Sequence, residues 1–253
     1  MSDQESFMSH LIELRQRLVR AVGTVLALFI VLFIWPGSGY IYDLLAAPLM
    51  SALPEGAKMI ATGVITPFMV PVKVTALAAF LVALPYVLYQ AWAFVAPGLY
   101  EHEKKLAAPL VVGSTVLFLC GVAFCYYIVF GRVFTFIHNF APKSITPAPD
   151  IEAYFSFVIT MFLAFGVTFE IPIVVIVLVR MGLVSVDKLR DARPYVIVGA
   201  FVVAAVVTPP DVLSQFMLAL PMCLLYEAGL FLARFISVSA KPESDNQGQT
   251  TVP

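Results

Sequence analysis

Six long apolar runs constrain the fold of this chain more than any other feature of its sequence. A helix needs about 20 apolar residues to cross a hydrocarbon core of roughly 30 Å. We expect six transmembrane helices, over about residues 18–35, 74–96, 106–131, 153–179, 195–207 and 212–233. Only 12% of the 253 residues are charged, against about 25% in soluble domains, so little polar surface is available to cover a water-soluble globule. The sequence therefore predicts an all-α membrane protein.

The runs divide the chain into one membrane domain, residues 1–235, and a polar tail, residues 236–253, which is expected to be disordered in the cytoplasm. The fifth and sixth helices are predicted to be short and to form a hairpin. About 13 residues of the fifth precede Pro209, which is roughly 20 Å of helix and less than the core thickness. Local thinning of the bilayer, or contact with neighbouring helices and partner subunits, would accommodate this mismatch. A short helix with little tilt is the alternative.

Basic residues between the runs predict the orientation of the helices. Eleven Lys and Arg residues fall on one side and four on the other, and basic loops stay in the cytoplasm. Both termini are therefore expected to be cytoplasmic. The first outer loop, about residues 36–73, is long and rich in proline, and is expected to form an ordered cap with a short helix near residues 41–53.

An amphipathic segment, about residues 7–18, precedes the first span. Phe7, Leu11, Leu14 and Leu18 share one helix face, which is typical of a helix lying at the cytoplasmic interface before it turns into the membrane. Glu13 lies on a more polar face, four residues before Arg17. The simplest interpretation of that spacing is a helix-stabilising ion pair, and a binding role for Glu13 is the alternative.

The Cys and His residues predict neither a metal site nor a cofactor. All three cysteines fall inside apolar runs and are interpreted as buried small hydrophobes, and the three histidines have no second ligand at a metal-like spacing.

One carboxyl group, Glu170, is expected near mid-membrane, about ten residues before Arg180. A carboxylate there is costly, so a functional role is the first hypothesis and a protonated, hydrogen-bonded structural acid is the alternative. Pro172 removes the hydrogen bond to the carbonyl of Thr168 and leaves an acceptor beside the acid. Gln90, and also Gln215, are candidate partners, so Glu170 and Gln90 are predicted to form an intramembrane polar site.

Five segments in order resemble the TatC family, the large polytopic subunits of twin-arginine protein translocases. The resemblance runs from about residue 8 to residue 235. The segments are His10 to Arg15, Phe94 to Lys105, Phe165 to Pro172, Arg193 to Tyr195 and Thr208 to Gln215.

The resemblance implies a receptor for Arg-Arg signal peptides, with Glu13 and Glu103 as the matching carboxylates and Phe94, Leu99 and Tyr100 beside them. A guanidinium presents a planar fork of donors that a carboxylate accepts at two points, whereas lysine is a point charge. Two carboxylates at the cytoplasmic face are therefore suited to selecting two arginines over two lysines.

The resemblance also implies a core scaffold in the bacterial inner membrane, built as a concave, cup-like bundle and driven by the proton gradient. The implied partners are TatB-like and TatA-like single-span subunits, further copies of the chain and the lipid bilayer, with no nucleic acid. Thr208, Asp211 and Gln215 match the docking region for the single-span subunits. Capping of the sixth helix is the alternative role for Asp211.

Two other functional classes compete with a receptor. A proton-coupled small-solute carrier would use Glu170 as its coupling carboxylate, but no internal repeat is visible in the sequence. An intramembrane protease needs a buried nucleophile with its base, or paired aspartates, and no aspartate lies deep in a predicted span. We therefore expect a binding and scaffold protein that is not an enzyme.

Overall fold

The regular elements of the computed structural model are helices, and residues 2–51, 58–95, 104–140, 148–208 and 211–237 are described. They are α1 (Ser2–Leu32), η1 (Phe33–Gly37), α2 (Ser38–Met50), α3 (Thr66–Val95), α5 (Lys104–Phe124), η2 (Cys125–Val129), α6 (Phe130–Phe140), α7 (Ile151–Phe169), α8 (Ile171–Arg180), α9 (Val186–Asp191), α10 (Arg193–Val207) and α11 (Val212–Ser237). Within these ranges β-pairing is limited to a bridge between Ile60 and Asp150. The all-α prediction is confirmed.

Five helical segments are long and apolar enough to cross a membrane, and α10, with 15 residues, is a shorter apolar helix. The five are His10–Met50, Thr66–Phe94, Ala108–Ile137, Ile151–Arg180 and Val212–Phe235. The prediction of a short sixth helix is wrong, because α11 has 26 residues. Pro221 inside it removes only one backbone donor, and the apolar run continues on both sides.

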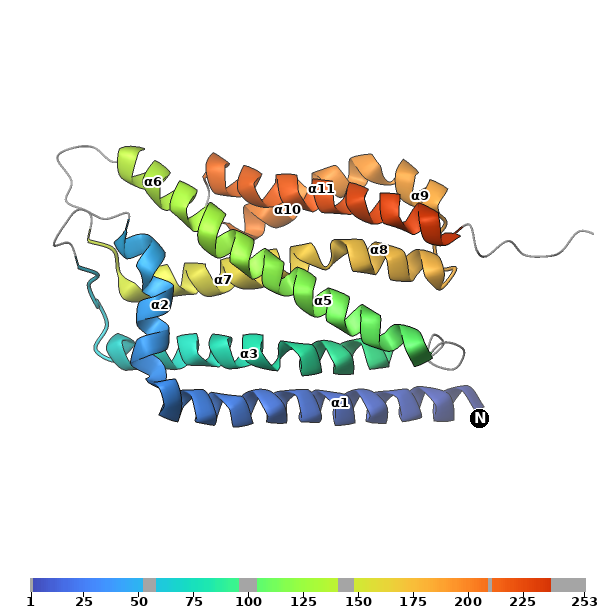
Figure 1. Cartoon of the computed structure of the whole chain (residues 1–253), viewed down its shortest axis with the longest axis horizontal. Helices are drawn as coiled ribbons and strands as arrows, with labels where there is room; N and C mark the ends of the chain where they lie inside the picture. Colours follow the sequence, from blue (N-terminus) through green and yellow to red (C-terminus); the bar gives the residue numbers. More distant parts are fainter. Residues whose placement is uncertain (1, 52–57, 96–103, 141–147, 209–210, 238–253) are drawn as a thin grey trace, which may run out of the picture.

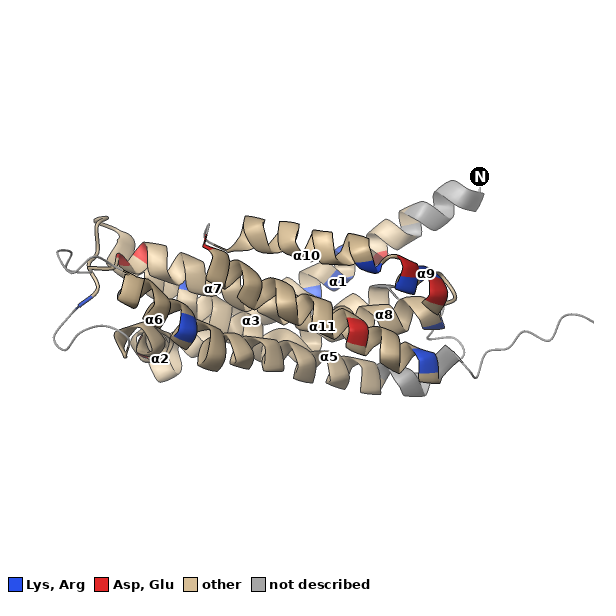
Figure 2. Ribbon diagram, turned by 90° about the horizontal axis from the view of Figure 1, so that it is seen from above, with Lys and Arg blue, Asp and Glu red and all other residues tan. Residues whose placement is uncertain are grey.

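The long helices lie roughly along a common axis (Figure 1). α1 packs against α3, α5 crosses the bundle diagonally, and α10 and α11 lie beyond α7 and α8. The start of α1 and the end of α11 lie at one end, here called the terminal end, and α2 lies across the opposite end, here called the cap end. Charged residues lie mostly toward these two ends (Figure 2), as expected for helices whose middle parts face lipid.

Two breaks redirect the chain. At the first, Trp35 leaves the helical region with φ −147° and ψ 126°, Pro36 follows, and Gly37 takes a φ of 98°, which glycine tolerates best. The chain then turns into α2, the short helix expected in the outer loop. At the second break α7 ends and α8 begins at Glu170, because Pro172 cannot donate to the preceding turn.

α1 has no such break. The expected turn between the amphipathic segment and the first span is wrong, because α1 is one helix over 31 residues. No proline interrupts residues 2–32, and the single glycine of this stretch, Gly23, costs only about 1 kcal/mol of helix stability.

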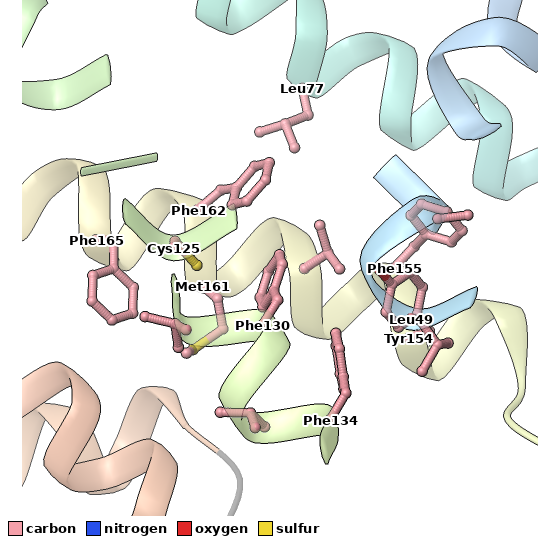
Figure 3. Packing of buried hydrophobic residues seen from close by; sticks show 14 of the residues in the cluster. Leu49, Leu77, Cys125, Phe130, Phe134, Tyr154, Phe155, Met161, Phe162 and Phe165 are labelled. Carbon is pink, nitrogen blue, oxygen red and sulfur yellow. The ribbon is translucent and has the colours of Figure 1, made fainter. Parts of the chain in front are cut away.

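Aromatic residues make up much of the buried hydrophobic cluster (Figure 3). Phe130 and Phe162 are stacked with ring centroids 5.4 Å apart, and both are buried. Cys125 is fully buried in the same cluster, as predicted for the cysteines. Cys120 is instead exposed and Cys223 is half-buried, because an apolar run that faces lipid places some of its residues on the outer surface.

Glycines allow α5 and α7 to approach closely. A Cβ on Gly121 would lie 2.5 Å from the carbonyl oxygen of Phe165, and a Cβ on Gly166 would overlap the ring of Phe118. Each helix thus presents a glycine to an aromatic residue of the other, and small residues of this kind let membrane helices approach closely.

Candidate functional site

The contact between α1 and α3 at the terminal end brings together residues from two of the recognised segments. The ring of His10 on α1 stacks on the ring of Phe94 on α3, with centroids 4.5 Å apart and an interplanar angle of 23°. Phe94 is half-buried in this position. One turn earlier on α3, Gln90 is buried, with 5% of its surface exposed, and faces the same helix.

Arg17 links Glu13 to Gln90. Its Nε and Nη2 donate to Glu13 Oε1 at 2.8 Å and 2.5 Å, and its Nη1 donates to Gln90 Oε1 at 3.3 Å. The side chains of Arg17 and Glu13 are 23% and 41% exposed, so the carboxylate is open to solvent while the guanidinium is more enclosed. We call His10, Glu13, Arg17, Gln90 and Phe94 the α1–α3 cluster.

This cluster contains only part of the predicted peptide site. Glu13 and Phe94 are both in it, and the expected ion pair of Glu13 with Arg17 is confirmed. Glu103, Leu99 and Tyr100 lie outside the described residues. Gln90 was not predicted to join Glu13 and Phe94. The sequence held a signal for it, since Gln90 and Phe94 are four residues apart and so share one face of α3.

The predicted pairing of Glu170 with Gln90 is wrong. Gln90 lies in the last turns of α3 and faces α1, whereas Glu170 lies at the α7–α8 junction. Gln215, the other candidate, donates to the carbonyl of Phe201 at 3.2 Å. A buried amide takes the nearest backbone or side-chain partner, and each of these glutamines has one on another helix.

Glu170 is 8% exposed, and neither of its carboxyl oxygens has a hydrogen-bond partner among the described residues. The hydroxyl of Ser114 on α5 lies near the carboxyl group, and it accepts a hydrogen bond from Trp92 Nε1 at 2.8 Å. Beside this junction, α11 approaches α8 closely, since a Cβ on Gly229 would lie 2.9 Å from the Cα of Pro172. Glu170 is therefore a buried carboxyl group with unused hydrogen-bonding capacity.

The α10–α11 hairpin at the cap side holds the three residues predicted to dock partner subunits. Thr208 is buried, and its hydroxyl donates to the carbonyl of Ala204 at 2.8 Å. Asp211 Oδ1 accepts from the backbone N–H of Ser214 at 2.7 Å, so the expected capping of the last helix by Asp211 is confirmed. Asp211 and Gln215 remain half-buried on the surface of the hairpin.

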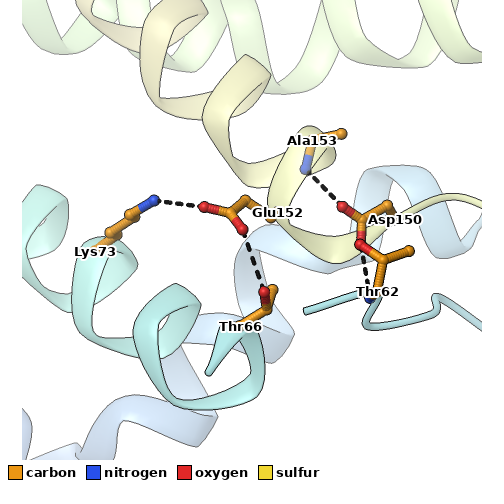
Figure 4. Close-up of polar contacts among 6 residues, drawn as sticks. All are labelled: Thr62, Thr66, Lys73, Asp150, Glu152 and Ala153. Carbon is orange, nitrogen blue, oxygen red and sulfur yellow. Dashed lines mark hydrogen bonds and ion pairs between the residues drawn. The ribbon is translucent and has the colours of Figure 1, made fainter. Parts of the chain in front are cut away.

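A polar constellation at the cap end, not predicted from the sequence, joins α3 and the segment before it to the start of α7 (Figure 4). Asp150 accepts from the backbone N–H and the hydroxyl of Thr62, at 3.3 Å and 3.2 Å, and it also caps α7. Glu152 contacts Lys73 at 3.0 Å and Thr66 at 3.2 Å. A capping residue at 150, directly before an apolar helix, was the signal available in the sequence.

Two contacts at the terminal end were also missed. Arg193 at the start of α10 pairs with Glu227 of α11 at 2.6 Å, and Tyr226 donates to the carbonyl of Leu189 at 2.6 Å. Together they attach the α9–α10 corner to the last helix.

Comparison with known proteins agrees with the resemblance of the motifs. The family model for Sec-independent protein translocase protein (TatC) matches residues 9–221. The TatC protein of Haemophilus influenzae is 50% identical over 235 residues, 93% of this chain and 91% of the relative. The TatC protein of Escherichia coli K12 is 46% identical, with 93% and 90% covered. A crystal structure of the twin-arginine translocase receptor TatC superposes with a TM-score of 0.79, at 37% identity, and 89% of this chain and 98% of that chain are covered. This chain therefore belongs to the TatC family of protein translocase subunits.

Proposed function

We propose that this chain is the receptor for twin-arginine signal peptides and the core scaffold of a translocase that exports folded proteins with energy from the proton gradient. One observation carries the proposal: a half-exposed carboxylate, Glu13, already accepts two N–H donors of a guanidinium. Its surroundings are therefore compatible with arginine as a ligand. Family membership supports the same function.

Selection of arginine follows from the shape of the guanidinium group. The two arginines of the peptide are received by Glu13 and by Glu103, which the family resemblance supplies. Exposed ion pairs contribute only about 0–1 kcal/mol, so selectivity depends on geometry and on partial exclusion of water. The half-buried ring of Phe94, stacked on His10, supports such exclusion beside Glu13. Phe94, Leu99 and Tyr100 contact the apolar part of the peptide.

The chain crosses the bacterial inner membrane six times, with both termini in the cytoplasm. Five long apolar helices and the shorter α10 support this count, and the common end shared by the start of α1 and the end of α11 supports the placement of the termini. The terminal end is then cytoplasmic, which puts the α1–α3 cluster on the side where cargo is made.

TatB-like and TatA-like single-span subunits dock at the α10–α11 hairpin, and further copies of the chain join the complex. Asp211 and Gln215 are half-buried on that hairpin, and α10 is too short to match the bilayer alone. Glu170 with its unused oxygens lies on the concave, membrane-embedded face.

Site-specific photo-crosslinking in membranes tests the receptor function. A photoreactive residue at Ile12, which is exposed and adjacent to Glu13, leaves the carboxylate intact. It should label an Arg-Arg signal peptide strongly and a Lys-Lys peptide weakly, and Glu13→Gln should reduce the label. The same probe at Val22, exposed further along α1, is the control. Equal labelling by the two peptides would refute the receptor function.

A proton-coupled solute carrier is the second candidate, and the observation in its favour is the buried, unpaired carboxyl of Glu170. Vesicles containing this chain alone would then take up solute when a proton gradient is applied, and Glu170→Gln would stop the uptake. A receptor without partner subunits is expected to give no uptake.

A further inference from the structure

We infer that Ser114, held by Trp92, is the positioning residue of Glu170: it binds one oxygen of that carboxyl group and leaves the other oxygen free. The inference rests on the proposed function, in which Glu170 lies on the membrane-embedded face of the translocase. It names the residues of α5 and α3 that orient the carboxyl group at that face.

The packing of α5 against α7 and α8 carries the first step. A Cβ on Gly113 would lie 3.5 Å from Cδ1 of Ile173 in α8, and one on Gly121 would lie 2.5 Å from a backbone oxygen of α7. Since α7 precedes α8, the two contacts mean that α5 runs antiparallel to both. Ser114 follows Gly113 by one residue and Glu170 precedes Ile173 by three, so Ser114 and Glu170 lie within about one helical turn of the same level.

The hydrogen-bonding chemistry of Trp92 and Ser114 fixes the direction of the next bond. An indole can only donate, and Trp92 Nε1 donates to the hydroxyl oxygen of Ser114 at 2.8 Å. The hydrogen of that hydroxyl therefore remains for another group. Among the residues that the structure describes, no hydrogen bond uses it, whereas the neighbouring hydroxyl of Thr115 donates to the carbonyl of Val111 in its own helix.

Glu170 is the nearby acceptor that lacks a donor. Ser114 is fully buried and Glu170 is 8% exposed, so water does not readily replace a missing partner at either group. The hydroxyl lies near the carboxyl group, whose two oxygens have no hydrogen-bond partner within the described ranges. The terminal torsion of a glutamate is soft and a hydroxyl hydrogen turns to suit its acceptor, so small rotations complete the bond. Both buried groups thereby gain a partner.

This arrangement makes the two oxygens of Glu170 unequal. Ser114 has one hydroxyl hydrogen, so it holds one oxygen, and the other oxygen keeps its hydrogen-bonding capacity. Donation from Trp92 makes the hydroxyl a stronger donor, because consecutive hydrogen bonds polarise one another. Trp92 thus acts on Glu170 through Ser114.

Infrared spectroscopy of the full-length chain in membranes tests the bond itself. Subtracting the spectrum of the same chain with Glu170→Gln isolates the bands of this carboxyl group, whether it is protonated or ionised. Ser114→Ala should shift these bands, because one oxygen loses its donor, and Trp92→Phe should shift them less. Thr115→Val is the matched control, since it removes a hydroxyl that bonds within α5, and it should leave the bands in place. Unshifted bands in Ser114→Ala would overturn the inference.

Export of a folded reporter by the complete translocase tests the consequence for transport. Ser114→Ala should lower the export rate by roughly twofold to tenfold, the factor that corresponds to one hydrogen bond. Trp92→Phe should have a smaller effect and add nothing when Ser114→Ala is present, because it acts through the serine. An effect of Trp92→Phe that persists alongside Ser114→Ala would overturn this role of Trp92. Binding of the Arg-Arg peptide should stay within about twofold of the parent value in each variant, which verifies that the variants are folded.

The two readouts separate this inference from the function on which it rests. If Glu170→Gln leaves export unchanged, the proposed role of Glu170 in transport fails, and the infrared bands still decide whether Ser114 binds it. If Glu170→Gln lowers export while Ser114→Ala changes neither the bands nor export, the role of Glu170 stands and Ser114 only fills space beside it. Shifted bands without a loss of export would mean that the bond does not position Glu170 for transport, which also overturns the inference.

Discussion

The hydroxyl of Tyr126 in η2 donates a 2.7 Å hydrogen bond to the carbonyl of Leu44 in α2. Four residues after Leu44 stands Pro48, which has no N–H, so the carbonyl of Leu44 lacks its usual helical partner. A tyrosine from another helix therefore completes the hydrogen bonding that proline leaves open. The neighbouring carbonyl of Leu45 accepts from Tyr154 at 2.8 Å, although it retains the N–H of Leu49 within the helix.

This difference predicts that Tyr126→Phe is more destabilising than Tyr154→Phe. The first change removes the one described partner of a carbonyl, at a cost of about 1 kcal/mol, whereas the second removes a supplementary bond. Thermal unfolding in detergent, followed by circular dichroism, should show the larger drop in midpoint for Tyr126→Phe. Tyr127→Phe is the control, since Tyr127 is 78% exposed. A larger drop for Tyr154→Phe would contradict the assignment.

The close approach of α5 to α7 predicts that Gly121→Ala destabilises the bundle by about 1–3 kcal/mol. The added Cβ meets the backbone oxygen of Phe165, which cannot move without shifting α7. Gly131→Ala is the matched control, because a Cβ there has nothing within 4 Å. The yield of monodisperse protein and the unfolding midpoint should both fall for Gly121→Ala alone. Equal behaviour of the two variants would exclude close packing at Gly121.

Asp150→Ala should loosen the cap end more than Lys73→Gln does. Asp150 caps α7 and bonds to Thr62, and loss of a helix cap costs about 1 kcal/mol. Lys73 contributes one ion pair to Glu152, with both side chains nearly half exposed, and such pairs add little. Limited proteolysis of inside-out and right-side-out vesicles should reveal faster cleavage after Asp150→Ala. Asp150→Asn, which keeps a capping oxygen, should be protected almost as well as the parent chain.

Glu170→Gln should leave binding of the Arg-Arg peptide within about twofold of the parent value, because the α1–α3 cluster lies on other helices and shares no partner with Glu170. Export of a folded reporter is expected to fall, since the amide of glutamine, unlike a carboxyl group, cannot gain or lose a proton at that buried position. Crosslinking and export measured on the same membranes check both parts. Glu152→Gln, a change of an exposed carboxylate in the first turn of α7, is the control, and complete loss of peptide binding in Glu170→Gln would show that the role assigned to Glu170 is wrong.

Local spacing predicted the parts of the molecule that depend on neighbours in the sequence. Apolar runs indicated the helices, the four-residue interval from Glu13 to Arg17 indicated their ion pair, and the position of Asp211 before an apolar run indicated its capping role. Each of these depends on a single helix or its first turn. The helical geometry alone determines which atoms can meet.

Contacts between distant segments were not predictable in the same way. Gln90 meets Arg17 across 73 residues, and Thr62 meets Asp150 across 88 residues. In a soluble helix an apolar stripe would indicate the buried face, but α3 is apolar on most sides, because lipid and protein interior favour the same residues. The sequence therefore identified Gln90 and Glu170 as unusual polar residues in apolar runs without indicating which helix each one faces.

The attachment of α1 to the rest of the bundle gives the α1–α3 cluster a thermodynamic role. α1 packs chiefly on α3, and none of the α1 side chains that the structure describes is buried. If a signal peptide bridges Glu13 on α1 and Phe94 on α3, as proposed, its binding free energy also stabilises the contact between the two helices, and by linkage a more stable α1–α3 contact tightens peptide binding. Peptide binding would thus stabilise the contact between α1 and α3. At peptide concentrations above the dissociation constant, the N-terminal helix would dissociate less readily from the bundle.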